Sequence, residues 1–246
     1  MRVMGVDLAA APKSTGVVVL EAIDETNWRA VHLPGPPTDD TLVSAARTVD
    51  IIGVDSPLGW PRAFVEAVDA HNSFRPWPGG TDRSTLTHRD TDRAIRRHGI
   101  RAALSVSADK LGSVGMRCAL LQRRWAEVWG QPAPRDGSGR LVETYPAAAL
   151  TAWQVGYAGY KDRRDLPAAR TVREQIIRDV GAAVSAWLDL AGVHEPCVES
   201  DHVLDALVSG LVAIAAASGA LPLLNPDPRV ARSSSRIDGR EAGPPR

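Results

Sequence analysis

The segment IIGVDSPLGW at residues 51–60 joins a hydrophobic run to an acid, and the same pattern stands at the start of the chain. The apolar run that begins at Ile51 ends at Asp55, and the run that begins at Val3 ends at Asp7. Continuous apolar character is typical of a strand that is covered on both faces. A carboxylate is costly to bury unless it is paired or binds a cation. The repeated Gly-Val-Asp therefore indicates that the two acids meet.

The composition is that of an ordinary globular protein. The chain has 246 residues, of which 44% are hydrophobic and 24% are charged, so it can bury a core without disulfides. The two cysteines, Cys118 and Cys197, show no zinc-ligand spacing and suit a reducing compartment. No signal peptide precedes the first strand, and the apolar stretch 206–217 is too short to span a bilayer. We therefore expect a cytoplasmic protein with no membrane partner.

Charge is distributed unevenly along a chain whose net charge is zero. Between Arg83 and Arg124 there are ten Lys or Arg residues and three Asp or Glu residues. A block of this kind can form a phosphate-binding surface. A solvated helical face is the equally good alternative.

The order of the predicted elements is typical of an α/β sheet. Hydrophobic periodicity, turn residues and caps define the element limits. They predict strands over residues 2–8, 15–21, 28–33, 50–55 and 141–145, and helices over residues 38–48, 61–70, 90–98, 110–129, 146–155, 166–191 and 200–218.

Three antiparallel strands, a helix, and then parallel strands with helices on both faces resemble the ribonuclease H-like fold, whose core the actin-like domains share. We expect one such α/β domain over residues 1–224, with a helical insertion over residues 60–138 and a disordered tail over residues 225–246. Ligands of open α/β sheets bind at the carboxyl ends of strands. Asp7 and Asp55 stand at two such ends.

Six motifs carry a more specific resemblance, namely GVDLAAAPKSTG (5–16), IIGVDSPLGWP (51–61), RDTDR (89–93), ETYPAAAL (143–150), GYK (159–161) and SDHVLDALVSGLVA (200–213). The first resembles the first hairpin of RuvC-type resolvases, with a longer turn and without their glycine after the aspartate. Together the six resemble the domain-of-unknown-function 429 family of predicted ribonuclease H-like nucleases. The resemblance implies that fold and a carboxylate site.

The last predicted helix adds a further acid to this site. Asp201 and Asp205 are four residues apart on one helical face, and His202 is three residues from Asp205. Asp201 suits a helix N-terminus, whereas Asp205 lies one turn inside an apolar helix, where a carboxylate needs compensation. In RuvC-like enzymes a pair of the form D/H-x-x-D at this place binds metal, and His202 to Asp205 has that form.

Carboxylates from four elements form the expected catalytic and metal-binding site. Carboxylate oxygens are the ligands that Mg²⁺ or Mn²⁺ prefers, and two such ions can stabilise both oxygens of a phosphodiester displacement. For Glu143 an exposed strand end is the alternative reading. The expected catalytic acids and metal ligands are Asp7, Asp55, Glu143 and Asp205, with His202 and Asp201 as further metal ligands.

Basic residues near these acids are the candidates for substrate contact. Lys13 lies in the predicted turn that follows Asp7, and Lys161 follows a Gly turn. Arg89 and Arg93 share one face of a predicted helix. An exposed turn lysine and ion pairs within the helix are the alternatives.

These observations predict a metal-dependent nuclease or phosphodiesterase that hydrolyses DNA or RNA. Two alternatives stay open. An actin-like phosphotransferase or ATPase would share the core, but the sequence has no second Gly-rich phosphate loop and no late adenosine-binding Gly-Gly segment. A non-catalytic binding module would retain the acids as remnants.

Overall fold

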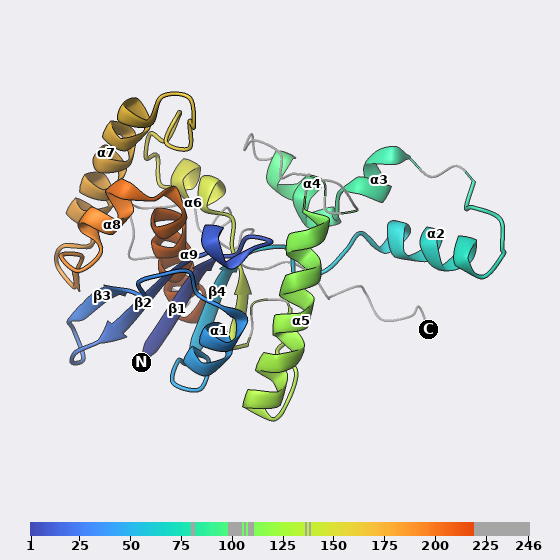
Figure 1. The fold of residues 1–246 in the computed structure, drawn as a ribbon, viewed down its shortest axis with the longest axis horizontal. Helices are drawn as coiled ribbons and strands as arrows, with labels where there is room; N and C mark the ends of the chain where they lie inside the picture. Colours follow the sequence, from blue (N-terminus) through green and yellow to red (C-terminus); the bar gives the residue numbers. More distant parts are fainter. Residues whose placement is uncertain are drawn as a thin grey trace, which may run out of the picture.

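One mixed sheet with helices on both faces organises the chain (Figure 1). The structure is a computed structural model, and it describes residues 1–79, 82–97, 105, 107, 111–135, 137 and 139–218. Within this part of the chain, six strands follow the order β5-β4-β1-β2-β3-β6. The predicted α/β class is confirmed, and the predicted tail lies outside the described residues.

The first three strands form the antiparallel half of the sheet. β1 (Arg2–Asp7) pairs with β2 (Gly16–Ala22), which pairs in turn with β3 (Trp28–His32). The short 3-10 helix η1 (Pro12–Ser14) joins β1 to β2. The β-branched run of β2 favours an extended chain. These strands agree with the predicted ones to within two residues at each end.

The parallel half of the sheet begins at β4. β4 (Ile51–Asp55) lies parallel to β1, and β5 (Leu141–Glu143) lies parallel to β4. The register sets Gly5 opposite Gly53 and Asp7 opposite Asp55. The two Gly-Val-Asp segments therefore lie side by side.

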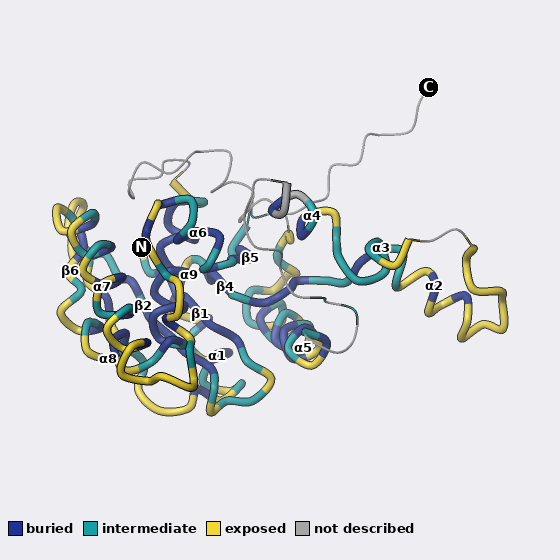
Figure 2. Tube along the Cα trace, turned by 90° about the horizontal axis from the view of Figure 1, so that it is seen from above, coloured by how far each residue is buried: buried dark blue, intermediate teal, exposed yellow. Residues whose placement is uncertain are grey.

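Helices cover the sheet on both faces, and a further group extends away from it beyond β4 (Figure 1). α1 and α5 pack on one face, and the four helices from α6 to α9 pack on the other. Figure 2 shows that the buried trace is concentrated in the strands and α9, whereas α2 is largely exposed. The bounds are α1 (Asp39–Ala45), α2 (Arg62–Asn72), α3 (Arg83–Thr87), α4 (Asp90–Arg97), α5 (Gly112–Trp129), α6 (Pro146–Ala152), α7 (Leu166–Val184), α8 (His194–Glu199) and α9 (Asp201–Ser218).

α9 is the central helix of the core. By length and composition it could cross a membrane, but 78% of it is buried inside the fold. A helix that is apolar on all sides is expected where protein surrounds it. α9 is therefore a core helix of this fold.

Glycines let α9 lie directly on the backbone of the sheet. A Cβ atom on Gly5 would stand 1.9 Å from the carbonyl oxygen of Ala206, and one on Gly53 would stand 2.3 Å from that of Ser209. Residues two apart on a strand point to the same face. In each Gly-Val-Asp segment the Gly and the Asp therefore face α9, while the Val packs with α1 and α5 on the other face.

The structure corrects the predicted helix over residues 166–191. α7 ends at Val184, and the chain continues into the short strand β6 (Leu188–Asp189) and then α8. β6 pairs with Trp28 and Arg29 at the edge of β3, and the Trp28 amide donates a hydrogen bond to Trp187. This pairing joins distant segments, so helical periodicity in the sequence does not reveal it.

α5 lies within the predicted helical insertion but belongs to the body of the fold. Its Cys118, Leu121 and Trp125 are fully buried and pack with the face of β1 and β4 that points away from α9. The chain segments that extend away from the sheet are α2 and α3 (Figure 1).

We expect Gly5→Ala to destabilise the protein by about 3 kcal/mol or more. The added methyl group would overlap backbone atoms of α9, which cannot change rotamer to make room as a side chain can. Urea unfolding of the variant and the parent measures the difference. Gly156→Ala is the matched control, since a Cβ atom there has no neighbour within 4 Å. Equal loss of stability in the two variants would contradict a tight contact between helix and sheet.

Candidate functional site

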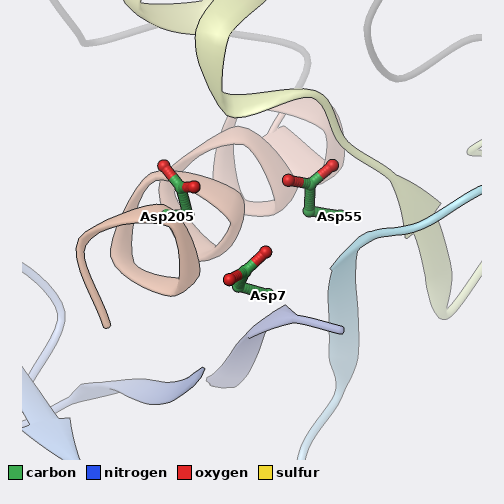
Figure 3. A group of neighbouring side chains, drawn as sticks. All are labelled: Asp7, Asp55 and Asp205. Atoms are coloured by element: carbon green, nitrogen blue, oxygen red, sulfur yellow. The ribbon is translucent and has the colours of Figure 1, made fainter. Parts of the chain in front are cut away.

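Three carboxylates converge at the carboxyl ends of β1 and β4 (Figure 3). Asp7 ends β1, Asp55 ends β4, and Asp205 comes from the second turn of α9. One oxygen from each carboxylate lies within 4.8 Å of the others. The expected meeting of Asp7 and Asp55 is found, and the glycine contact of α9 adds Asp205 to it.

Asp205 is the most deeply buried of the three acids, with no exposed surface. Tyr160 donates a hydrogen bond of 2.9 Å to its Oδ1, and the ammonium of Lys161 forms an ion pair with its Oδ2. Burial raises the pKa of Asp205 to about 7, and repulsion from Asp7 adds to this while Lys161 opposes it. The chain therefore only partly compensates this carboxylate.

Asp55 experiences the same lack of compensation. Burial raises the pKa of Asp55 well above its ordinary value, and the charges of Asp7 and Asp205 raise it further. Like charges at this separation repel strongly where water is excluded. The three acids thus form a local excess of negative charge.

His202 and Asp201 lie beside this group and not within it. His202 Nδ1 lies 2.6 Å from Asp7 Oδ2, and this hydrogen bond raises the pKa of His202. Asp201 forms an ion pair of 3.0 Å with Arg163. His202 therefore contacts a carboxylate of the site, and Asp201 has Arg163 as its partner. Metal binding by either residue stays a prediction.

Glu143 is held by an arginine. Arg89 donates from Nη1 and Nη2 to the two carboxylate oxygens at 2.8 and 2.6 Å, and the amide of Leu58 donates to Oε2 at 3.0 Å. Arg89 also forms an ion pair of 2.8 Å with the buried Asp92. The planar guanidinium suits such a double carboxylate contact. The structure therefore does not bring Glu143 into the three-acid group, and substrate contact by Arg89 stays a prediction.

The sequence has one informative similarity. A family model described as "Protein of unknown function (DUF429)" matches residues 5–229. The chain belongs to this family. No curated protein and no solved structure matches it. The family read from the six motifs is thus confirmed, and the matched segment contains all three acids.

In this DUF429 protein the acids adjoin a pocket of about 770 Å³. Asp7 and Asp55 line it directly, whereas Asp205 lies behind Tyr160 and Lys161, which line it as well. Arg89 and its partners Asp92 and Glu143 line it too, and the further charged and aromatic lining residues are Tyr145, Tyr157, Asp162, Arg163 and Arg164. The pocket thus combines acids with cations and aromatic side chains.

The remaining candidates for substrate contact lie away from this pocket. Lys13 is exposed in η1, and Arg93 donates to the carbonyl of His88 and pairs with Asp90. Neither residue lines the pocket. Within the basic block, Arg117 pairs with Asp39 and other described arginines also pair with acids. Arg101 and Lys110 lie outside the described residues, so a phosphate-binding surface there stays a prediction.

Sequence reasoning missed Tyr160 as a partner of Asp205, and it missed the basic pair Arg163 and Arg164 at the pocket. The signal was available in part, because GYKDRR at residues 159–164 sets a tyrosine and three cations together. Only the fold shows that this segment lies over α9.

We expect the stability of the metal-free protein to depend on pH through Asp205. Its pKa is about 7 in the folded chain and 3.8 ordinarily, so between these values the folded state binds more protons than the unfolded state. The free energy of unfolding then falls as pH rises from about 4 to about 7. Melting temperatures measured in chelator across this pH range should fall more steeply with rising pH for the parent than for Asp205→Asn. Parallel curves would contradict the raised pKa.

We expect Arg89→Met to lower the free energy of unfolding by about 3–5 kcal/mol, because two buried carboxylates lose their cation. Adding Glu143→Gln should restore part of that loss. Arg93→Met, one turn further along the chain in α4, is the control, since its partner Asp90 is 80% exposed and such pairs contribute at most about 1 kcal/mol. Urea unfolding measures all three, and equal effects at the two arginines would contradict a buried network.

Proposed function

We propose that the protein is a metal-dependent nuclease or phosphodiesterase with a ribonuclease H-like fold. The convergence of Asp7, Asp55 and Asp205 from two parallel strands and the central helix carries the proposal. The strand order supports the fold, since three antiparallel strands are followed by β4 and β5 parallel to β1.

The donor set suits a hard divalent cation. Three carboxylates offer only oxygen, which Mg²⁺ and Mn²⁺ prefer, and the two cysteines are buried in the hydrophobic clusters. Asp7, Asp55 and Asp205 would hold the ion, whereas Glu143 is engaged by Arg89. When bound, such an ion supplies a Lewis acid that lowers the pKa of water and offsets phosphoryl charge.

The surrounding residues would orient the reactants. His202 fixes the Asp7 carboxylate, and Tyr160 fixes that of Asp205. Asp7 and Asp55 line the pocket, so a carboxylate oxygen of either would be placed to accept a proton from a water there. Arg163 and Arg164 at the pocket would bind a phosphate.

Nucleic acid is the substrate class that this pocket suits. Its cations match a polyanion, and Tyr145 and Tyr157 offer faces on which a base or sugar can pack. Two buried free cysteines fit a cytoplasmic location, where DNA and RNA are available.

We expect Asp205→Asn to weaken Mn²⁺ binding by about 100-fold or more and to abolish cleavage, because one of three ligands loses its charge. The variant should stay folded, since Asn has nearly the same shape and relieves repulsion. Asp201→Asn is the matched control on the same helix and should bind Mn²⁺ like the parent. Calorimetric titration with Mn²⁺ and cleavage of labelled DNA and RNA measure both properties.

The two readouts test separate parts of the proposal. Parental Mn²⁺ affinity in Asp205→Asn would contradict the three-acid site. Tight Mn²⁺ binding by a parent that cleaves neither DNA nor RNA would contradict the nuclease. ATP hydrolysis by that parent would then favour the actin-like phosphotransferase.

A further inference from the structure

Among the described residues, two basic side chains form ion pairs with the three-acid group. His202 pairs with Asp7 and is charged only when it is protonated, whereas Lys161 pairs with Asp205 through its ammonium group. Its ammonium pairs with Asp205 Oδ2, and it also lies 5.2 Å from the centre of the Tyr160 ring. Asp205 has no exposed surface, whereas the Lys161 side chain is 47% exposed and lines the pocket. The lysine therefore connects the buried acid to the pocket.

The backbone here is anchored by hydrogen bonds, while the lysine side chain is partly exposed. Arg173 donates from Nη1 to the carbonyl of Tyr160 at 2.7 Å and from Nε to that of Val198 at 2.7 Å, which ties this segment to α7 and α8. Tyr160 itself is buried. A lysine side chain has four methylene groups and a single point of charge, so it leaves a carboxylate more readily than a bidentate arginine.

A metal ion and this ammonium would compensate the same charge, that of the Asp205 carboxylate. Each compensates a carboxylate that burial and neighbouring acids disfavour. Two cations held at one carboxylate oxygen would repel each other, so binding of one favours departure of the other. The other acids near the site have partners of a different kind, with Glu143 held by two guanidinium nitrogens and Asp201 held by Arg163.

We propose that Lys161 is a built-in counter-ion of the acid group that exchanges with the metal ion, which displaces its ammonium from Asp205 into the pocket. This inference rests on the metal site of the proposed function and assigns a positioning role to a residue outside the ligand set. In the metal-free protein Lys161 stabilises the buried carboxylate. In the metal-bound protein the same ammonium is available on the pocket wall.

Lys161→Met tests the exchange directly, because methionine keeps an unbranched apolar stem and removes the charge. We expect it to bind Mn²⁺ on the order of tenfold more tightly than the parent, since the competing cation is gone. Its melting temperature in chelator should be lower than that of the parent, and Mn²⁺ should raise it by more. Lys161→Arg should not bind Mn²⁺ more tightly than the parent, and Lys13→Met, at an exposed lysine outside the pocket, should match the parent.

A second measurement uses the unaltered protein and does not depend on any variant folding. The chain has three lysines, so reductive methylation followed by mass spectrometry reports each one separately. With Mn²⁺ present, labelling of Lys161 relative to the exposed Lys13 should rise several-fold. An unchanged ratio would overturn the exchange.

The outcomes separate this inference from the proposed function. A parent that does not bind Mn²⁺ overturns both. A parent that binds Mn²⁺ while Lys161→Met binds it equally or more weakly overturns the exchange alone. If Lys161→Met binds Mn²⁺ more tightly but the parent cleaves no nucleic acid, the exchange is supported and the proposed nuclease function is contradicted.

Discussion

The contact of α9 with bare strand backbone is the constraint on which the rest of the structure depends. Gly5 and Gly53 have no side chains to hold the helix away, and a Cβ atom at either position would collide with helix carbonyl oxygens. Close approach replaces side-chain packing with backbone contact at the centre of the core. It also brings the second turn of the helix to the strand ends, where Asp205 reaches Asp7 and Asp55.

Charge compensation distinguishes the acids of this region. Glu143 and Asp92 share one arginine through several short hydrogen bonds, which is a fixed arrangement that ties α4 to the end of β5. The three-acid group has weaker compensation, from one flexible lysine and one histidine. Because burial, and after it repulsion between the acids, raises the pKa values of Asp55 and Asp205, this group is the one that gains most from a further cation.

The cations of this region also differ in how firmly they are held. Arg89 and Arg173 bind acids or carbonyl groups within the fold and hold distant segments together. Lys161 and Arg164 are exposed at the pocket and are held less firmly. The fold thus fixes the acids, while Lys161 and Arg164 are partly or largely exposed.

The sequence by itself determined the α/β class, the order of the first five strands, the buried last helix and the meeting of Asp7 with Asp55. Those features follow from local apolar runs, from periodicity and from a repeated segment. Such patterns can be read from the sequence without knowing which distant segments are in contact. The role of glycine in Gly-Val-Asp was not among these features, because the pattern of a strand does not say which helix packs on it or how closely.

Only the tertiary structure decided which partner each polar side chain has. Glu143 at a strand end reads like Asp55, yet its partner Arg89 stands 54 residues away in the chain. His202 reads like a metal ligand, but it lies against Asp7, 195 residues away. The end of α7 depends likewise on β6 pairing with β3. Such pairs depend on distances in space, and a carboxylate looks the same in the sequence whether an arginine, a lysine or a metal ion compensates it.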